Sequence, residues 1–377
     1  RGNGRSYGDS AINRKNTIDM TGFNRFLEFD YSNGLLSVQS GTLLSDIIDI
    51  FLPKGWFPYV TPGTKFVSIG GMVAADVHGK NHVNYGSFSN HVEWIEILNS
   101  DGEIIRCSRN KNSDLFMSTF GGMGLTGIIL NIAFYMRPVN TAWISQKQLP
   151  ARNLKKTMDI IESNLDSTYI AAWIDCLSNG ENLGRSIIYI GEHSEIYDLE
   201  HHAKENPLRI KRPKKISIPF HFPTILLKKF FIKIFNSFLY KKSLISKTRK
   251  IVEWDNYFYP LDKILNWNRV YGKKGFAQFQ CVLPIENSYK GLKEILDAIS
   301  KSEASSFLGV LKRFGEQNSY FSFPMRGYSI ALDFPITKKS LLLMETLDEI
   351  TLRYGGRFYL AKDSRMKRDV FQRSDNR

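Results

Sequence analysis

The amino-acid sequence predicts an α+β protein of two domains. In the C-terminal half, helices expected over 287–300 and 341–354 alternate with strands expected over 307–312 and 328–334. From about Pro138 onwards the strands become longer, aromatic residues more frequent and glycines fewer. Because 377 residues suffice for two domains of ordinary size, we place a domain boundary near residue 140.

The first 110 residues carry short elements separated by polar turns. They comprise expected strands over 17–20 and 34–40, a helix over 43–52, and a hairpin of 92–99 with 103–107. The helix has apolar residues at helical spacing and ends before Pro53-Lys54-Gly55. Ser100-Asp101-Gly102 supplies the hairpin turn.

The glycines of residues 122–127 match the pattern GxGxxG. A dinucleotide-binding fingerprint needs a strand before the glycines, a helix after them and an acidic residue about twenty positions later. Here 113–119 predicts a helix, 128–136 predicts a β-branched strand, and 137–158 contains no Asp or Glu. We therefore interpret the glycines as a close-packed turn and leave open whether it touches a ligand.

The second half contains one strand with a clear division of faces. Besides this strand, the second half of the chain is expected to contain a helix over 154–165 and strands over 169–176 and 184–190. Residues 275–283 alternate, which puts Gln278 and Gln280 on one face and Phe279 and Cys281 on the other. Two neighbouring amides suit hydrogen bonding to a polyhydroxylated ligand, and two solvated strand residues fit the pattern equally well.

Two glycine turns lie within the first 71 residues. Residues 1–10 contain three glycines among small and hydroxyl-bearing residues, and residues 62–71 form a second such turn. Glycine lets backbone N–H groups approach a large anionic group such as a diphosphate. Either turn alone fits an ordinary tight turn, but both together, followed by the polar stretch 76–82, favour a cofactor site.

The net charge of +14 is concentrated in one segment. Residues 204–250 contain fourteen Lys and Arg residues and one acidic residue, Glu205, so they carry 13 of the 14 net charges. Such a segment attracts an anionic surface, either nucleic acid or phospholipid. Nucleic acid is disfavoured because no recognised binding motif accompanies the charge.

Within this segment a helix with two unlike sides is expected. One side carries Leu227, Phe230, Phe231, Ile234 and Phe238, and the other carries Lys229, Lys233, Asn236 and Ser237. A basic amphipathic helix can lie in a lipid headgroup layer. The alternative is a helix that docks its apolar side on the domain and leaves its basic side in solvent.

Composition excludes several classes of protein. Hydrophobic residues make up 42% and charged residues 23%, as in folded soluble proteins. Cys107, Cys176 and Cys281 lack the spacing of a disulfide framework or a metal site and are expected to be buried thiols in a reducing compartment. No apolar run is long enough to span a bilayer, so we expect a cytoplasmic protein or one peripheral on a membrane face. Because the chain opens at Arg1 inside a motif, we expect further residues to precede it.

Six motifs in unchanged order carry a family resemblance. They are RGNGRSYGDS, TPGTKFVSIGGMVAADVHGKNH, YGSFSNHV, FGGMGLTGII, WNRVYGKKGFAQFQCVLP and YLAKDSR. Together they resemble the decaprenylphosphoryl-β-D-ribose 2-oxidase family, which belongs to the vanillyl-alcohol-oxidase type of FAD enzyme. The resemblance implies a two-lobed, PCMH-type FAD-binding domain of residues 1–140 and a returning segment 357–377. These would clasp a substrate domain of residues 141–356, built on an antiparallel sheet flanked by helices.

The resemblance also implies which residues hold the cofactor. They are Arg1, Gly2, Asn3, Gly4, Arg5, Ser6, Tyr7, Gly8, Asp9, Ser10, Gly63, Ser68, Ile69, Gly70, Gly71, Ala75, Asp76, Val77, His78, Ile129 and Tyr359. Many related oxidases attach FAD covalently to a histidine in the first loop. Arg5 stands at that position here, so the expected FAD is non-covalent.

For catalysis, the resemblance assigns Lys362 a place beside the flavin and the reacting hydroxyl. An ammonium group there would stabilise the negative charge that develops as hydride leaves the substrate. His78 or Tyr271 would accept the hydroxyl proton, although His78 could instead only orient the flavin. Residues expected to line the substrate pocket are Tyr271, Gln278, Gln280 and Lys312, of which Lys312 suits a phosphate oxygen. No metal ligand is expected.

The implied reaction is oxidation of the 2-hydroxyl of a polyprenyl-phosphate pentose to a ketone. A separate NAD(P)H-dependent short-chain reductase would complete the epimerisation, in cell-envelope polysaccharide synthesis. Two alternatives are an oxidase of a soluble sugar, alditol or aldonolactone, and a membrane-surface binding protein that has lost its chemistry. The family's active-site cysteine is Ala331 here, which leaves the activity unaffected and sensitivity to thiol-directed inhibitors open. Tyr328 and Ser329 depart from the common pattern, so the exact sugar stays open.

Overall fold

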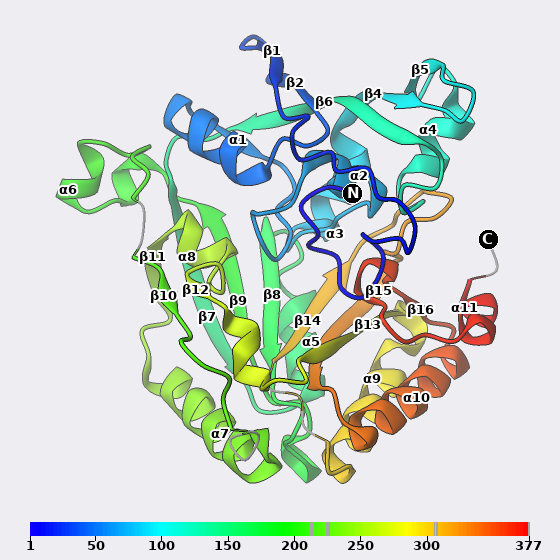
Figure 1. Ribbon diagram of the computed structural model, residues 1–377. Coiled ribbons are helices and arrows are strands. Elements are labelled where there is room, and N and C mark those ends of the chain that lie inside the picture. Colours follow the sequence, from blue (N-terminus) through cyan, green and yellow to red (C-terminus); the bar gives the residue numbers. More distant parts are fainter. Residues whose placement is uncertain (212–213, 224–226, 305, 307, 376–377) are drawn as a thin grey trace.

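A computed structural model describes residues 1–377 except 212–213, 224–226, 305, 307 and 376–377. The chain forms two antiparallel sheets, one above the other in Figure 1. The first sheet has six strands: β1 (Phe26–Asp30), β2 (Leu35–Gln39), β3 (Trp56–Pro58), β4 (Val92–Leu98), β5 (Ile104–Ser108) and β6 (Ile128–Pro138). Their order is β1-β2-β6-β4-β5, and β3 also pairs with β6. The helices of this part are α1 (Leu44–Phe51), α2 (Ile69–Ala74), α3 (His82–Tyr85) and α4 (Ser113–Thr119).

The second sheet has eight strands in the order β11-β7-β9-β8-β14-β15-β13-β16. They are β7 (Trp143–Ala151), β8 (Tyr169–Ile174), β9 (Ser186–His193), β11 (Arg249–Glu253), β13 (Phe276–Pro284), β14 (Gly309–Phe314), β15 (Gly327–Pro335) and β16 (Arg357–Phe358). A separate short parallel pair consists of β10 (Ile216–Ser217) and β12 (Ile264–Leu265). The remaining helices are α5 (Leu154–Glu162), α6 (His201–Lys204), α7 (Lys229–Ile245), α8 (Trp254–Phe258), α9 (Ile285–Lys301), α10 (Lys338–Arg353) and α11 (Arg368–Ser374).

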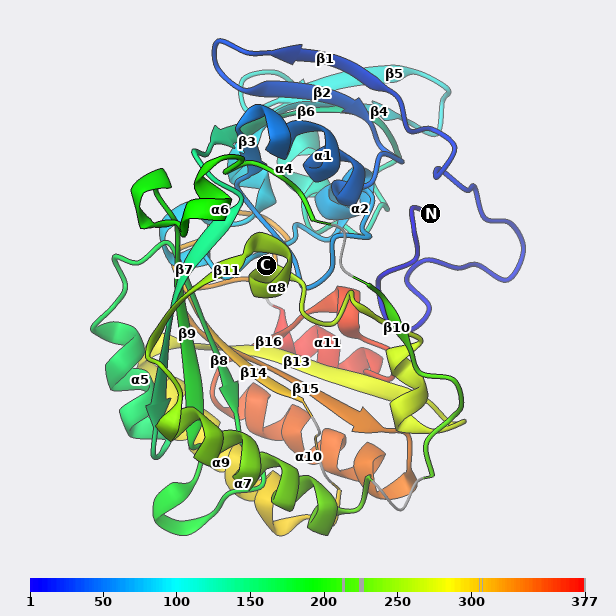
Figure 2. The same cartoon turned by 90° about the vertical axis from the view of Figure 1, so that its left-hand side faces the viewer.

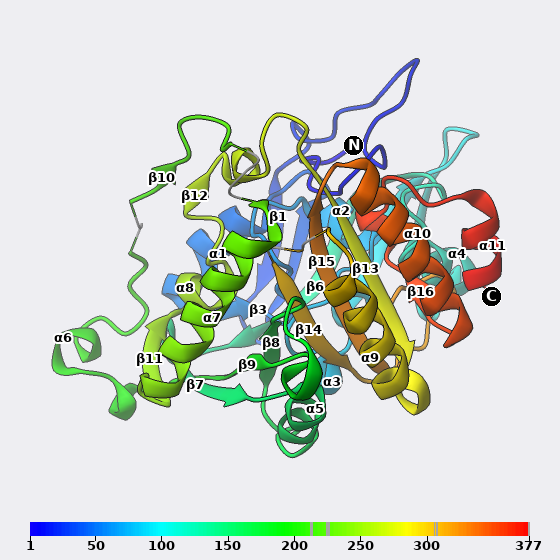
Figure 3. The same ribbon diagram turned by 90° about the horizontal axis from the view of Figure 1, so that it is seen from below.

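Side-chain alternation divides the second sheet into an apolar face and a polar face. Phe279, Ile330 and Leu332 join a core with apolar residues of α9 and α10, such as Leu292 and Leu347. Figure 3 shows these two helices and α7 covering the sheet on its lower side. The opposite face carries Gln278 and Gln280 and is turned towards the N-terminal part of the chain, so polar groups collect between the two layers.

Most predicted elements are confirmed, including those that exclude a dinucleotide-binding turn. The helix over 113–119 is α4, and the strand that follows the glycines is β6. The hairpin of β4 and β5 also forms as expected. The predicted strand over 17–20 is wrong, because this stretch is irregular and the first strand is β1, which pairs with β2. Phe307, in a predicted strand, lies outside the described residues.

The two ends of the chain meet. Figure 2 shows the N-terminal loop descending from the first sheet towards the second. After β16 pairs with β13, the carbonyl oxygen of Ala361 accepts a 2.9 Å hydrogen bond from the backbone N–H of Tyr7. The domain limits near 140 and 357 stay a prediction. No helix in the described part of the chain combines the length and apolarity needed to cross a membrane.

Candidate active site

The two glycine turns lie against each other. Asn3 Nδ2 donates a 2.7 Å hydrogen bond to the carbonyl oxygen of Phe66. A Cβ on Gly2 would lie 1.9 Å from Ser68 Oγ, so this approach requires glycine. Among the described residues, the backbone N–H groups of residues 2–6 have no hydrogen-bond partner. These N–H groups are therefore available to an anionic ligand.

The C-terminal segment closes a third side of this site. Gly8 has a φ of +70°, and a Cβ there would lie 2.4 Å from the carbonyl oxygen of Asp363. Lys362 Nζ lies 3.8 Å from the centre of the Tyr7 ring, within reach of a cation–π interaction. The predicted first loop and the predicted catalytic lysine are thus in contact.

The register of the second sheet brings a buried carboxylate to the predicted substrate residues. Gln278 is paired with Asp333, and its Nε2 donates a 2.5 Å hydrogen bond to Asp333 Oδ1. The Tyr271 hydroxyl lies 3.4 Å from Asp333 Oδ2. Burial raises the pKa of Asp333 to about 6, opposed by the Gln278 hydrogen bond and the charge of Lys362. Burial also raises the pKa of Tyr271, so its hydroxyl stays protonated at neutral pH.

His78 is a buried, neutral imidazole. Its Nε2 lies 3.2 Å from Gln280 Nε2, and its ring packs against Phe314 and Tyr359 with centroids 4.8 and 5.0 Å away. Burial, reinforced by the charge of Lys312, holds the pKa of His78 well below its usual value. Its Nδ1 has no hydrogen-bond partner among the described residues, so one ring nitrogen is left for a ligand.

Three lysines supply an excess of positive charge. Burial lowers the pKa of Lys362 and of Lys312 to about 8 and that of Lys80 to about 7. Lys80 Nζ donates to the carbonyl oxygen of Tyr257 at 2.5 Å, and none of the three makes an ion pair with the described acidic side chains. Asp333 is the carboxylate whose charge acts on Lys362. Buried cations without paired carboxylates suit an anionic ligand.

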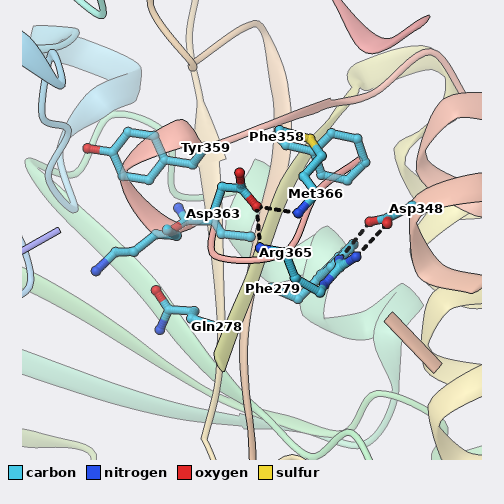
Figure 4. A pocket seen from close by; sticks show the side chains of 10 residues that line it. Gln278, Phe279, Asp348, Phe358, Tyr359, Asp363, Arg365 and Met366 are labelled. Atoms are coloured by element: carbon cyan, nitrogen blue, oxygen red, sulfur yellow. Dashed lines mark hydrogen bonds and ion pairs between the residues drawn. The ribbon is translucent and has the colours of Figure 1, made fainter. Parts of the chain in front are cut away.

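The loop that carries Lys362 is fixed to α10. Figure 4 shows Arg365 donating to both carboxylate oxygens of Asp348, at 2.6 and 2.8 Å. Asp363 Oδ1 accepts hydrogen bonds from the backbone N–H groups of Arg365 and Met366, at 3.0 and 2.8 Å. A cavity of about 20 Å³, lined by Gln278, Gln280 and Lys362 among others, lies beside this loop and has room for about one water.

Comparisons with known proteins identify the family. Residues 1–108 match a family model described as an FAD binding domain. The chain is 37% identical over 376 residues to decaprenylphosphoryl-β-D-ribose oxidase of Mycolicibacterium smegmatis. The aligned region covers 98% of this chain and 81% of that protein. The chain belongs to this family. It is also 25% identical to mouse L-gulonolactone oxidase over 188 residues (50% of this chain, 41% of that one), and 30% identical to D-lactate dehydrogenase of Anaerostipes hadrus over 143 residues (37% and 30%).

As a member of this family, the chain is an FAD-dependent oxidoreductase, and its residues fit the cofactor. Residues 2–6 offer unpaired backbone N–H groups, Gly63 borders open space, and Nδ1 of His78 has no hydrogen-bond partner among the described residues. Tyr359 donates a hydrogen bond to the carbonyl oxygen of Ala75 at 3.3 Å. Which of the predicted residues contact FAD, and the non-covalent attachment of the cofactor, stay predictions.

Other predicted cofactor residues have protein partners. The Asp76 carboxylate accepts hydrogen bonds from the backbone N–H of Ser89, at 2.9 Å, and from the Ser322 hydroxyl. Arg1 pairs with Asp19 at 3.2 Å. These two side chains are thus engaged in holding the loops that surround the site.

Sequence reasoning missed Asp333 and Lys80. Alternation along β15 puts Asp333 on the same face as Ser329 and Ala331, so the strand pattern contained the signal. Lys80 lay within the polar stretch 76–82, but nothing local distinguished it from a solvated lysine.

Proposed function

We propose that this protein oxidises the 2-hydroxyl of a polyprenyl-phosphate pentose, similar to decaprenylphosphoryl-β-D-ribose, to the 2-keto sugar. The observation that carries the proposal is the group of unpaired lysines beside the polar face of the second sheet, in a chain 37% identical to the mycobacterial oxidase. Lys312 would contact a phosphate oxygen, and Gln278 and Gln280 would bind sugar hydroxyls.

FAD, when bound, supplies the acceptor for the hydride that leaves the sugar carbon. Lys362 would stabilise negative charge near the reacting centre, because its ammonium lies in a poorly hydrated site where electrostatic interactions are strong. Because the pKa of Lys362 is about 8, most Lys362 side chains are protonated and carry this charge at pH 7. Tyr7, against which Lys362 packs, would hold the amine in position.

Asp333 would accept the hydroxyl proton. A pKa of about 6 leaves its carboxylate ionised at neutral pH and close to the range in which a general base is most effective. Of the two acceptors predicted from sequence, Tyr271 is protonated, and His78 is a weak base because its pKa is strongly lowered. Tyr271 and Gln278 would orient the Asp333 carboxylate, and His78 would orient the flavin or the substrate.

The keto product implies a second enzyme. An NAD(P)H-dependent short-chain reductase that returns hydride from the opposite face would invert the carbon and complete an epimerisation. No nucleic-acid partner is proposed.

A second candidate is oxidation of a soluble sugar or aldonolactone. The match to L-gulonolactone oxidase over half of the chain favours it. Lys312 favours the phosphorylated substrate instead, because a neutral lactone offers nothing to balance a second buried ammonium.

Anaerobic titration of the purified flavoprotein tests these proposals. Polyprenyl-phosphoribose is expected to bleach the flavin absorbance, whereas free ribose, the matched sugar without lipid phosphate, is expected to be ineffective at the same concentration. Bleaching by L-gulono-1,4-lactone but not by the polyprenyl phosphate would establish the second candidate. A protein that binds no flavin when any residues preceding Arg1 are included would refute both.

A further inference from the structure

Helix α7 packs on the second sheet through polar contacts. Lys229 Nζ donates to the carbonyl oxygen of Ser300 at 2.5 Å, and Asn236 Nδ2 donates to Asp175 Oδ1 at 2.7 Å. Asn236 is buried, and between these two contacts Ile232 adds one apolar side chain to the core. The helix is therefore attached by one side whose anchors are mainly polar.

The opposite side of α7 is apolar and faces outward. Phe230, Ile234, Phe238 and Ile245 are 67, 54, 66 and 87% exposed, and they recur at helical spacing. We call these four residues the outer stripe. A helix docked on a soluble domain normally buries its apolar side. The predicted alternative, in which the apolar side of the helix docks on the domain, is therefore wrong: Lys229 points inward and Phe230 and Phe238 point outward, although Lys233 of the predicted basic side does remain in solvent.

Basic residues surround the outer stripe. Lys233, Lys241 and Lys242 on the helix are exposed, and so are Lys247 and Lys250 beyond its end. No acidic residue occurs from 229 to 250. In Figure 3, α7 lies at the outside of the sheet, and no helix or strand of the described residues covers its outer side. The surface combines contiguous exposed apolar groups with a strong positive charge.

We propose that the outer stripe of α7 docks on an anionic phospholipid surface, with the helix lying in the headgroup layer and the surrounding lysines contacting lipid phosphates. Aromatic and aliphatic side chains on one face with Lys beside them are the composition of interfacial helices. A second copy of this chain is a poorer occupant, because a two-fold contact through the stripe would bring the same lysines of both copies together. The proposal does not depend on the identity of the sugar substrate.

Vesicle co-flotation tests the proposal with the intact flavoprotein. The protein is expected to float with phosphatidylcholine vesicles that contain 30 mol% phosphatidylglycerol and to remain behind with pure phosphatidylcholine. The double variant Phe230→Ser/Phe238→Ser is expected to lower the partition coefficient at least tenfold. Lys241→Gln/Lys242→Gln is expected to lower it about 25-fold, since each lysine near an anionic membrane contributes about fivefold.

Two control variants match these changes elsewhere on the surface. Ile104→Ser removes an apolar side chain that is 64% exposed on β5, and Arg14→Gln/Lys15→Gln removes two exposed charges from the N-terminal loop. Both are expected to bind vesicles like the unaltered protein, and flavin absorbance with thermal melting verifies that every variant is folded.

Three outcomes would overturn the proposal. The first is unchanged flotation of the stripe variant, and the second is equal binding to neutral and anionic vesicles. The third is a dimer, detected by light scattering, that dissociates on Phe238→Ser while no form of the protein binds vesicles; this result would assign the stripe to a second copy of the chain.

Discussion

Replacing Asp333 by Asn tests the proposed proton acceptor most directly. Asparagine keeps the size of the side chain and can still bond to Gln278 and Tyr271, so the change removes mainly the negative charge and the basic oxygen. A positioned general base contributes about 10²- to 10⁴-fold. We expect the rate constant of anaerobic flavin reduction at pH 7.5 to fall by at least about 10².

The pH profile supplies a sharper readout of the same variant. In the unaltered protein, reduction requires ionised Asp333 and protonated Lys362, so the rate is expected to fall below about pH 6 and above about pH 8. Asp333→Asn removes the acidic limb. Because the Asp333 charge raises the pKa of Lys362, its loss also moves the alkaline limb to lower pH.

The stability of the Asp333→Asn variant is expected to rise, whereas its rate of flavin reduction falls. The pKa of Asp333 is about 6 in the folded protein and 3.8 in the unfolded chain, so the folded state binds the proton more tightly. The contribution of this group to stability therefore falls as the pH rises from about 4 to about 6. At pH 7 the ionised carboxylate costs about 3 kcal/mol. Asp333→Asn should therefore raise the melting temperature at pH 7 while it lowers the rate.

Asp363→Asn is the matched control. It removes a negative charge next to Lys362, at the cavity lined by Gln278 and Lys362, but its Oδ1 can still accept the hydrogen bonds from Arg365 and Met366. Its profile should match that of the unaltered protein. An Asp333→Asn protein that retains both the rate and the acidic limb would refute the assignment of Asp333 as proton acceptor.

Four further results are expected. Lys362→Met should slow flavin reduction by about 10²- to 10³-fold in stopped-flow assays while FAD stays bound. Gly8→Ala should weaken FAD retention more than Gly4→Ala in equilibrium dialysis, because only at Gly8 does a Cβ meet backbone, 2.4 Å from a carbonyl oxygen. Acid precipitation should release all of the flavin into the supernatant, since Arg5 replaces the histidine of covalent flavoproteins; flavin retained in the pellet would contradict this. Asp175→Ala should cost about 1–3 kcal/mol in urea unfolding, because it leaves the buried amide of Asn236 and the half-buried guanidinium of Arg185 without their acceptor.

Local patterns predicted the parts of the site that depend on neighbouring residues in sequence. Glycines in residues 1–10 and 62–71 indicated backbone that approaches a large group, and alternation over 275–283 assigned Gln278 and Gln280 to one face. The order of helix, glycine turn and strand excluded a dinucleotide-binding turn, as α4 and β6 confirm. Each of these features follows from steric limits or periodicity within a dozen residues.

Failures arose where pairing between distant segments decides the structure. The stretch 17–20 was expected to be a strand, but β1 forms further on because Phe26 and the residues after it pair with β2. A short apolar stretch becomes a strand only where a partner edge is available, and its own sequence does not contain that information.

The sequence by itself determined the α+β class, the family, the FAD cofactor and the presence of an amphipathic helix in the basic segment, since all of these depend on motifs and spacing. Only the tertiary structure decided that Asp333 lies beside Gln278 and Tyr271, because the register of β13 with β15 joins Gln278 to Asp333 across 55 positions and the turn before β13 brings Tyr271 to the same carboxylate across 62. It also decided which side of α7 faces outward. Periodicity defines two faces of a helix, and the partners in the fold, here Asp175 and Ser300, select the face that is buried.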